Sequence, residues 1–472
     1  MLGNYIGVGA DGLTAAANDD DGIALADMSG IMIGGSAVGA GNVISGNTND
    51  GIFFFSASTA TILGNKVGTD STATIAVPNG GNGIWIRRAG SSAAIGDGTT
   101  AGQNIVAGNG ESNVYILNSG ITADIIGNRI GVGAGGEALG AGRHGIQIDG
   151  TSSGQVSGNI IAHNDLDGVF LESGGEPKFS IIGNSIFDNG NLGIDLHTNG
   201  PTANDNGDGD GGANERLNYP VIGAVRANGT VTLEYDITLD VPAHGQGYRV
   251  EFFKNSAADP TGFGEGEIFL GFVDVSGSGN HSGFLAATET VSVGDIISTT
   301  ATRKTGANSY DITSEFSFTY AADALVVGLD ANLTLDVYDP ASAGLFAIPS
   351  NDMVTTLTVA NTGNIAVDSE TLDLIVTLHP SLTFYNGDFD EAGPATEAVL
   401  FIDSSSGVIF NVAAHVRFKD GTTKPADFDA CDYSPASGYD PAVSYVCIKP
   451  GGSMQSGDPD PSFALKFRSQ IQ

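Results

Sequence analysis

The sequence has few basic residues and no long apolar run. Only 18 of its 472 residues are lysine or arginine, against 54 aspartates and glutamates, so the formal net charge is −36. Such a charge disfavours nucleic acid or an anionic membrane as a partner, and it favours cation binding or salty surroundings that screen self-repulsion. Without a run of about 18 apolar residues, the sequence contains no candidate membrane-spanning helix.

Cysteine and proline are also scarce. The two cysteines, Cys431 and Cys447, lie near the C-terminus and form one candidate pair, which is compatible with an extracellular protein. A disulfide between them would contribute roughly 3 kcal/mol, and two buried thiols are the alternative. With 70 glycines but only 16 prolines, the composition predicts many tight turns between short strands rather than disorder.

The first residues, "MLGNYI", enter directly on a repeat and lack the pattern of a signal peptide. Together with the secreted-type composition, this favours an extracellular or cell-surface protein whose sequence is truncated before its export signal and N-terminal cap. A cytoplasmic protein is the alternative.

An asparagine followed by two apolar residues recurs through the first 200 residues, as in "GNVISGNTNDGIFFF" at 41–55. The aligned asparagines are Asn4, Asn42, Asn65, Asn104, Asn128, Asn159 and Asn184. Their spacing alternates between short turns of 23 to 25 residues and longer turns that carry inserted loops. Each turn divides into three short strands and three bends, which is typical of a solenoid. Successive coils would rise by about 4.8 Å, and the asparagines would form a side-chain ladder.

These repeats resemble the right-handed parallel β-helix proteins of the pectate-lyase-like superfamily, and more narrowly bacterial secreted proteins whose coils repeat "NVISGN…DGI". The resemblance covers about residues 1–200. It implies an all-β fold that begins with a right-handed parallel β-helix of about seven coils over residues 1–203. Because the superfamily includes lyases, hydrolases, phage spikes and adhesins, the resemblance leaves the chemistry open.

The second strand of each coil alternates between inward and outward side chains. Its two inward columns are apolar throughout, from Ile23 and Leu25 to Ile194 and Leu196. The outward column consists of Ala24, Phe53, Trp85, Tyr115, Gln147, Phe170 and Asp195. Its aromatic members predict a stacking platform for sugar rings, with Gln147 as a hydrogen-bonding neighbour. The alternative is that inserted loops or a C-terminal domain cover this column and make it core.

Evidence for catalysis is weaker. Enzymes of this superfamily generally need a basic residue, a carboxylate-bound cation, or both. Arg87 and Arg88 follow Trp85 and are candidate bases, and Asp195 with His197 in "DLH" could orient a base. The polygalacturonase-like members carry a Gly-His-Gly and an Arg-x-Lys motif, and neither occurs in the repeats of residues 1–203.

A candidate calcium loop follows the repeats in "NDNGDGDGGANE", residues 204–215. Its predicted ligands are Asn204, Asn206, Asp208, Asp210 and Glu215. The oxygen spacing and the central glycine match a calcium loop, except that asparagine replaces the first aspartate. Helices do not flank it in the sequence pattern, so an Asp/Gly-rich linker over 204–217 is the alternative.

Beyond the repeats, alternating strand patterns predict two β-sandwich domains. Residues 218–322 resemble, in "YRVEFFKNSAADPTGFGEGEIFLG" and "TSEFS", the module that follows such β-helices in bacterial secreted proteins. Residues 323–472 resemble, in "MVTTLTVANTGNIAVDSETLDLIVTL", an Ig-like repeat domain of bacterial surface proteins.

The prediction for function is therefore a secreted or cell-surface protein without catalysis, either an adhesin or a protein that binds polysaccharide or a cell-surface glycan. Two alternatives stay open. One is a polysaccharide-degrading enzyme, a lyase before a glycoside hydrolase, and the other is a purely structural surface protein.

Overall fold

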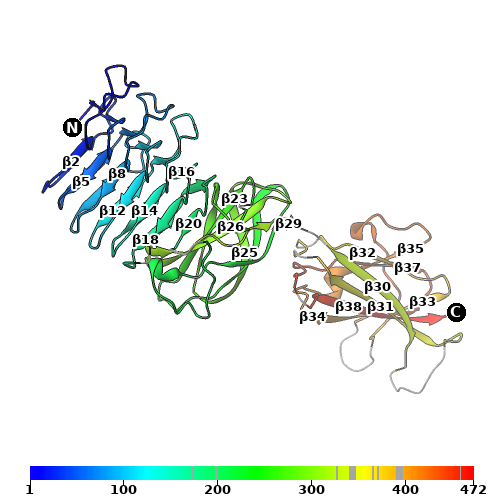
Figure 1. The fold of residues 1–472 in the computed structure, drawn as a ribbon. Helices are drawn as coiled ribbons and strands as arrows, with labels where there is room; N and C mark the ends of the chain where they lie inside the picture. The colour runs from blue at the N-terminus through cyan, green and yellow to red at the C-terminus, as the bar shows by residue number, and fades with distance from the viewer. Residues whose placement is uncertain are drawn as a thin grey trace. The chain divides into compact units, whose positions relative to one another are not determined.

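A computed structural model describes residues 1–472 apart from 173, 197–199, 259, 326–327, 340–346, 364–365, 369–370, 390–396 and 458. Contacts divide the chain into two compact units, Met1–Ala324 and Leu325–Gln472. The first unit begins with coils whose strands stack in parallel, as Figure 1 shows for the blue to green part of the ribbon. This arrangement is a parallel β-helix, as the sequence repeats predict.

Each coil contributes one strand to each of three parallel sheets. The first sheet runs through β1 (Tyr5–Ile6), β4 (Val43–Ile44), β7 (Lys66–Val67), β10 (Ile105–Val106), β13 (Arg129–Ile130), β16 (Ile160–Ala162) and β19 (Ser185–Phe187). The second runs through β2 (Ile23–Leu25), β5 (Ile52–Phe54), β8 (Ile84–Ile86), β11 (Val114–Ile116), β14 (Ile146–Ile148), β17 (Val169–Leu171) and β20 (Ile194–Asp195). The third runs through β3 (Ile31–Gly34), β6 (Thr59–Leu63), β9 (Ser92–Ile95), β12 (Thr122–Ile126), β15 (Ser153–Ser157) and β18 (Lys178–Ile182).

The interior of the β-helix is a continuous apolar core. The predicted inward columns of the second sheet are buried from Ile23 and Leu25 to Ile194 and Leu196. Residues of the other two sheets, such as Ile62 and Val106, complete this core. One coil alone cannot bury such a face, so stacking on the next coil supplies the hydrophobic stabilisation.

The predicted asparagine ladder is confirmed along its whole length. From Asn4 to Asn184, each side-chain amide donates to the side-chain carbonyl of the next asparagine, at distances of 2.9 to 3.1 Å. Each interior rung also accepts a backbone hydrogen bond, as Asn104 does from the Asn65 N–H at 2.9 Å. The buried amides are thereby satisfied, which a buried polar group requires.

A second ladder runs beside the first and was not predicted. It connects Asn18, Asn47, Asn79, Asn109, Asn113, Asn164 and Asn189. In the coil where Ala141 occupies the ladder position beside Asn109, the ladder is bridged by Asn113 of the preceding coil, which donates to Asn164 at 3.0 Å. The second asparagine of "NVISGN" was the available signal for this ladder.

An antiparallel sandwich follows the β-helix within the same unit. One sheet consists of β25 (Gly279–Val291), β22 (Thr230–Leu239), β21 (Val221–Ala227) and β29 (Asp323–Ala324). The other consists of β24 (Ile268–Val275), β23 (Tyr248–Asn255), β26 (Ile296–Gly306) and β27 (Ser309–Thr313), with β28 (Tyr320–Ala321) paired to β26. The short helix η1 (Ala213–Arg216) lies in the connection to the β-helix.

Carboxylates of this sandwich cap the last coil. Glu251 accepts from the Gly183 N–H at 2.9 Å, and Glu315 accepts from the Leu196 N–H at 2.9 Å. Glu265 accepts from the side-chain amide of Asn189 at 3.1 Å and so terminates the second ladder. An exposed strand edge is a template for unwanted pairing, and these contacts cover it. The β-helix and the sandwich are therefore one compact unit.

The second unit is also antiparallel. One sheet consists of β30 (Leu329–Val337), β31 (Asp352–Asn361), β38 (Ser462–Ile471), β33 (Leu382–Asn386) and β36 (Gly438–Asp440), with β34 (Val399–Ser404) paired to β38. The other consists of β32 (Leu374–Thr377), β37 (Val443–Ile448) and β35 (Val416–Asp420), and the short helices are α1 (Val412–His415) and η2 (Phe428–Ala430). Cys431 and Cys447 form a disulfide here. The all-β fold class is thus confirmed.

Within the described ranges, helices that are long and apolar enough to span a bilayer do not occur.

The ladder makes a prediction about stability. Asn104→Ala would remove hydrogen bonds to Asn65, Asn128 and the Ile62 carbonyl inside the core and would leave the Asn65 N–H without its acceptor, so we expect the free energy of unfolding to fall by about 3 kcal/mol. Asn4 occupies the same position on an exposed coil, and Asn4→Ala should cost about 1 kcal/mol or less.

Chemical denaturation followed by the fluorescence of Trp85, the single tryptophan, measures both variants within the β-helix. Equal losses for the two variants would show that the ladder does not stabilise the interior coils.

Candidate functional site

The outward row of the second sheet lies where the sequence register predicts. Strand pairing places Phe53 beside Trp85 and Trp85 beside Tyr115 on successive rungs. Gln147, Phe170 and Asp195 continue the row to the last coil. These side chains form one line on the outer face of the β-helix.

The rings of this row stack on one another. The centroids of Phe53 and Trp85 are 4.9 Å apart, and those of Trp85 and Tyr115 are 5.9 Å apart with ring planes only 4° from parallel. Each ring therefore covers the face of its neighbour, and the partly exposed Trp85 and Tyr115 present mainly ring edges to solvent. Phe53, Gln147 and Asp195 of the same row are buried, so the row is neither an open platform of ring faces nor buried throughout.

A second outward row follows two residues further along each strand. Its Phe55 is 54% exposed and meets Phe53 edge to face, with a centroid distance of 6.0 Å. The guanidinium of Arg87 lies 5.1 Å from the centroid of the Trp85 ring. Arg88, the other candidate base, donates from Nε to the Phe55 carbonyl at 2.9 Å. Sequence reasoning missed Phe55, although its parity places it on this face.

The same second row carries two neighbouring carboxyl groups, Asp149 and Glu172, that sequence reasoning also missed. The hydroxyl of Tyr115 donates to Asp149 Oδ2 at 2.7 Å, and Asp149 is 7% exposed. Burial, reinforced by Glu172, raises the pKa of Asp149 to about 7. Burial, together with the Asp149 contact, raises the pKa of Tyr115. Asp149 therefore keeps its proton up to near-neutral pH.

A cavity of about 590 Å³ lies where the outward row meets the sandwich. It is lined by Arg143, His144, Leu166, Asp167, Phe170, Gly190, Asn191, Leu192, Asp195, Gly200, Pro260 and Thr261. The His144 ring stacks on Phe170 with centroids 4.6 Å apart, and its Nδ1 lies 3.0 Å from Asp167 Oδ2. Asp195, a predicted catalytic candidate, lines this cavity, whereas its predicted partner His197 lies outside the described residues.

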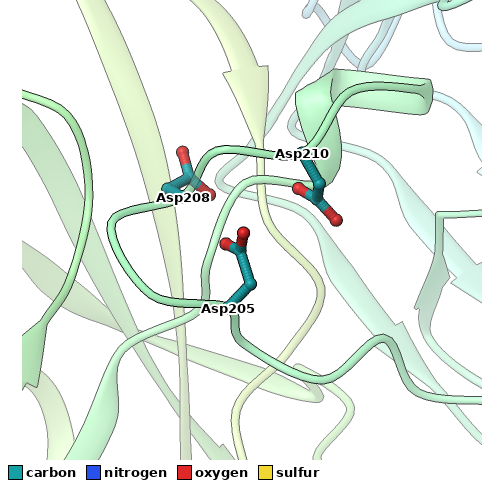
Figure 2. A group of neighbouring side chains, drawn as sticks. All are labelled: Asp205, Asp208 and Asp210. Atoms are coloured by element: carbon teal, nitrogen blue, oxygen red, sulfur yellow. The ribbon is translucent and has the colours of Figure 1, made fainter.

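The predicted calcium loop folds into a compact turn, but with a different set of carboxylates. Oxygens of Asp205, Asp208 and Asp210 lie within 4.8 Å of one another, as Figure 2 shows. Burial raises the pKa of Asp208 to about 6, and the negative charges of Asp210 and Asp205 contribute to the rise. Asn204 instead binds the backbone of Tyr219, with its amide 2.8 Å from the carbonyl oxygen. Asn206 is exposed on the same turn.

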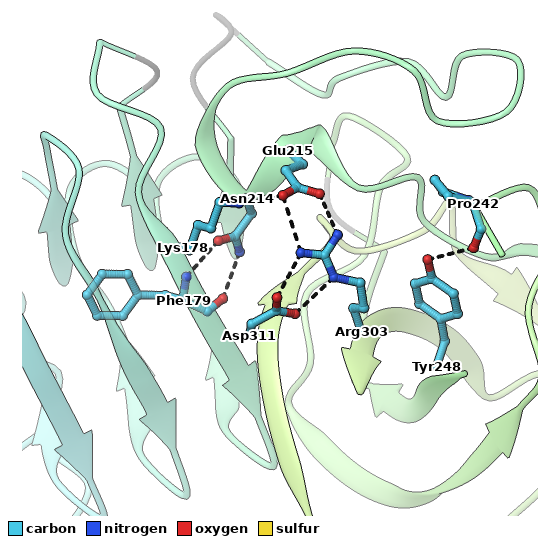
Figure 3. A network of polar contacts seen from close by, with 8 residues as sticks. All are labelled: Lys178, Phe179, Asn214, Glu215, Pro242, Tyr248, Arg303 and Asp311. Atoms are coloured by element: carbon cyan, nitrogen blue, oxygen red, sulfur yellow. Dashed lines mark hydrogen bonds and ion pairs between the residues drawn. The ribbon is translucent and has the colours of Figure 1, made fainter. Parts of the chain in front are cut away.

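Glu215, the predicted twelfth ligand, binds two cations and lies outside this carboxylate cluster. Its carboxylate contacts Lys178 Nζ and Arg303 at 2.5 Å each, and Arg303 also binds Asp311 at 2.7 Å (Figure 3). The hydrogen bond from Arg303, followed by that from Lys178, lowers the pKa of Glu215 to about 2. Next to it, Asn214 accepts from the Phe179 N–H at 2.7 Å. The segment thus fastens the sandwich to the β-helix.

The stacked parallel sheets and their buried ladders define a parallel β-helix. Residues 29–206 match the family described as right handed beta helix region, so this segment is a right-handed parallel β-helix. Among solved structures, the crystal structure of the Dettilon tailspike protein aligns at 10% identity over 96% of this chain and 87% of that chain, with a TM-score of 0.20. No argument rests on so low a similarity. None of the curated proteins matches the chain.

The Asp149 carboxyl predicts a pH dependence. Because its folded-state pKa is raised from 3.8 to about 7, its contribution to stability is complete below about pH 4 and is lost as the pH rises through about 7. Asp149→Asn imitates the protonated form, so we expect the variant to gain about 2 kcal/mol on the wild type between about pH 5 and pH 8.

Denaturant unfolding of both proteins across this pH range gives the difference directly. Other titrating groups contribute equally to both proteins, so their contributions cancel in the comparison. One such group is Glu251, because burial also raises its pKa to about 7. Parallel stability curves would contradict a proton held at Asp149.

Calcium binding stays a prediction, now centred on Asp205, Asp208 and Asp210. Three carboxylates suit a hard cation, and a bound Ca²⁺ would relieve their mutual repulsion. We expect calcium at about a hundredfold excess over its dissociation constant to stabilise the first unit by about 2–3 kcal/mol relative to EDTA. Asp208→Asn should remove most of that difference in thermal unfolding. Identical melting temperatures in calcium and EDTA would refute the site.

Proposed function

We propose that this chain is a secreted or cell-surface protein that binds an uncharged glycan along the outer face of the second β-helix sheet. The observation that carries the proposal is a continuous line of side chains from Phe53 to the cavity beside Phe170. Carbohydrate sites combine apolar ring surface with a few fixed polar groups. Along this line, the exposed Phe55 ring supplies the former. The latter are Gln147, which is 7% exposed, and the half-exposed Arg143 at the cavity.

The polar groups of this face are held in defined positions. Ser112 donates to the side-chain carbonyl of Gln147 at 3.0 Å, and Tyr115 donates to Asp149 at 2.7 Å. Because these side chains are already ordered, the surface loses less conformational entropy when a ligand binds. The face is therefore suited to binding hydroxyl groups of a sugar chain.

The charges favour an uncharged glycan over a polyuronate. Carboxyl groups of Glu172, Asp167 and Asp195 follow the face toward its far end, within a chain of net charge −36. Arg87, the cation nearest the aromatic row, already lies over Trp85. An anionic polymer would meet repulsion toward the far end of the face.

The lyase alternative rests on Arg87 and Arg88, and neither is placed beside the cavity. Their positions give this alternative no specific support, because Arg88 Nε is committed to a backbone carbonyl. Polysaccharide binding without catalysis is therefore the better interpretation of the geometry.

Substitution of Phe55 tests the proposal. We expect Phe55→Ala to weaken retention on the bound polysaccharide about tenfold, the equivalent of about 1.4 kcal/mol, because the exposed ring is lost. Phe284→Ala removes a ring that is 63% exposed on β25 of the sandwich and serves as the matched control. Pull-down on insoluble xylan, mannan, β-glucan, pectin and alginate measures both variants.

Equal retention of Phe55→Ala, Trp85→Ala and Phe284→Ala would contradict the proposed surface. Release of unsaturated products from pectin or alginate, detected by absorbance, would support the lyase alternative and contradict binding without catalysis.

A further inference from the structure

The outer face of the second sheet is open at its first rungs. Ala24, which begins the outward row, is exposed and carries only a methyl group. Phe55, on the next coil, is 54% exposed. From the Phe53 rung to the Phe170 rung the row spans four strand spacings, or about 19 Å. An extended ligand can therefore enter along the row from this side.

The opposite end is closed by the sandwich. The sandwich packs directly against the last coil: a side-chain carbon added at Gly193, just before β20, would lie 2.8 Å from the ring of Phe316. Glu315 accepts from the Leu196 N–H, and the segment at Pro260 and Thr261 forms part of the cavity wall. A chain that follows the row past Phe170 meets this wall and cannot continue along the β-helix.

The cavity in front of the wall has the size and chemistry of a sugar site. Its volume of about 590 Å³ falls within the range of small-ligand pockets. The partly buried Phe170 supplies apolar ring surface, and the buried Asp167 carboxylate holds the His144 ring in place from 3.0 Å. Arg143, whose side chain is 47% exposed, adds hydrogen-bond donors at the rim.

We infer that the face binds the end of a glycan chain, with the terminal sugar in the cavity and the following sugars along the outward row. This inference rests on the proposed function and specifies its ligand as a chain terminus. A groove open at both ends would accept any internal stretch of a polymer, whereas a closed groove accepts only an end.

The number of chain ends provides a test that does not require the sugar to be known. Immobilised xylan, mannan and β-glucan are compared intact and after partial acid hydrolysis, at equal mass. We expect the saturating amount of bound protein to rise in proportion to the number of chain ends. A saturating amount that stays constant or falls after hydrolysis would overturn binding of chain ends.

A pocket-filling variant tests the cavity itself. Asn191 is exposed and lines the cavity, so Asn191→Trp should weaken retention by about tenfold or more. Asn49 occupies the same turn position on an early coil, with an equivalent backbone hydrogen bond, and Asn49→Trp should retain wild-type binding. Thermal unfolding of both variants checks that they remain folded.

The outcomes separate the two proposals. Retention that is lost in Phe55→Ala but survives in Asn191→Trp would leave glycan binding intact and overturn the terminal site. Absence of retention on every polymer would refute the proposed function, and the terminal site with it.

Discussion

Hydrogen bonding between successive coils is the constraint on which this structure depends. A coil of short strands has no partner within itself for its backbone groups, so each group must find one on the coil before or after. The same requirement extends to side chains, because every coil after the first buries an asparagine such as Asn65 or Asn104. Equivalent residues are thereby held at one strand spacing, and this spacing lets Trp85 and Tyr115 stack.

The last coil has no following coil to accept its hydrogen bonds. Its N–H groups and ladder amides point at whatever follows, and the sandwich meets them with Glu251, Glu265 and Glu315. Carboxylates suit this position because they only accept hydrogen bonds when ionised. Their burial carries a cost, which appears as a raised pKa for Glu251 and Glu315. The closed end of the proposed glycan groove is a by-product of this cap.

Regular features of the fold were predictable, and features that depend on distant partners were not. The outward row from Phe53 to Asp195 followed from a period of two within a repeated coil, because strand geometry leaves little choice. Ring orientation does not follow from register, so the mutual covering of Trp85 and Tyr115 was missed. Glu215 matched a calcium pattern, yet Lys178 and Arg303, 37 and 88 residues away, bind it instead. Local spacing carries no information about such partners.

The asparagine ladders have a direction. In the side-chain bonds that join successive coils, the amide of the earlier coil donates to the carbonyl of the later one, and the second ladder ends on the Asn189 amide, which donates to Glu265 of the sandwich. The end that Glu265 neutralises is therefore the same whatever the number of rungs before it. Duplication or deletion of whole coils would lengthen or shorten the β-helix. The contact between Glu265 and the last coil would stay the same. Related proteins can therefore differ in the length of the β-helix and keep the same capping sandwich.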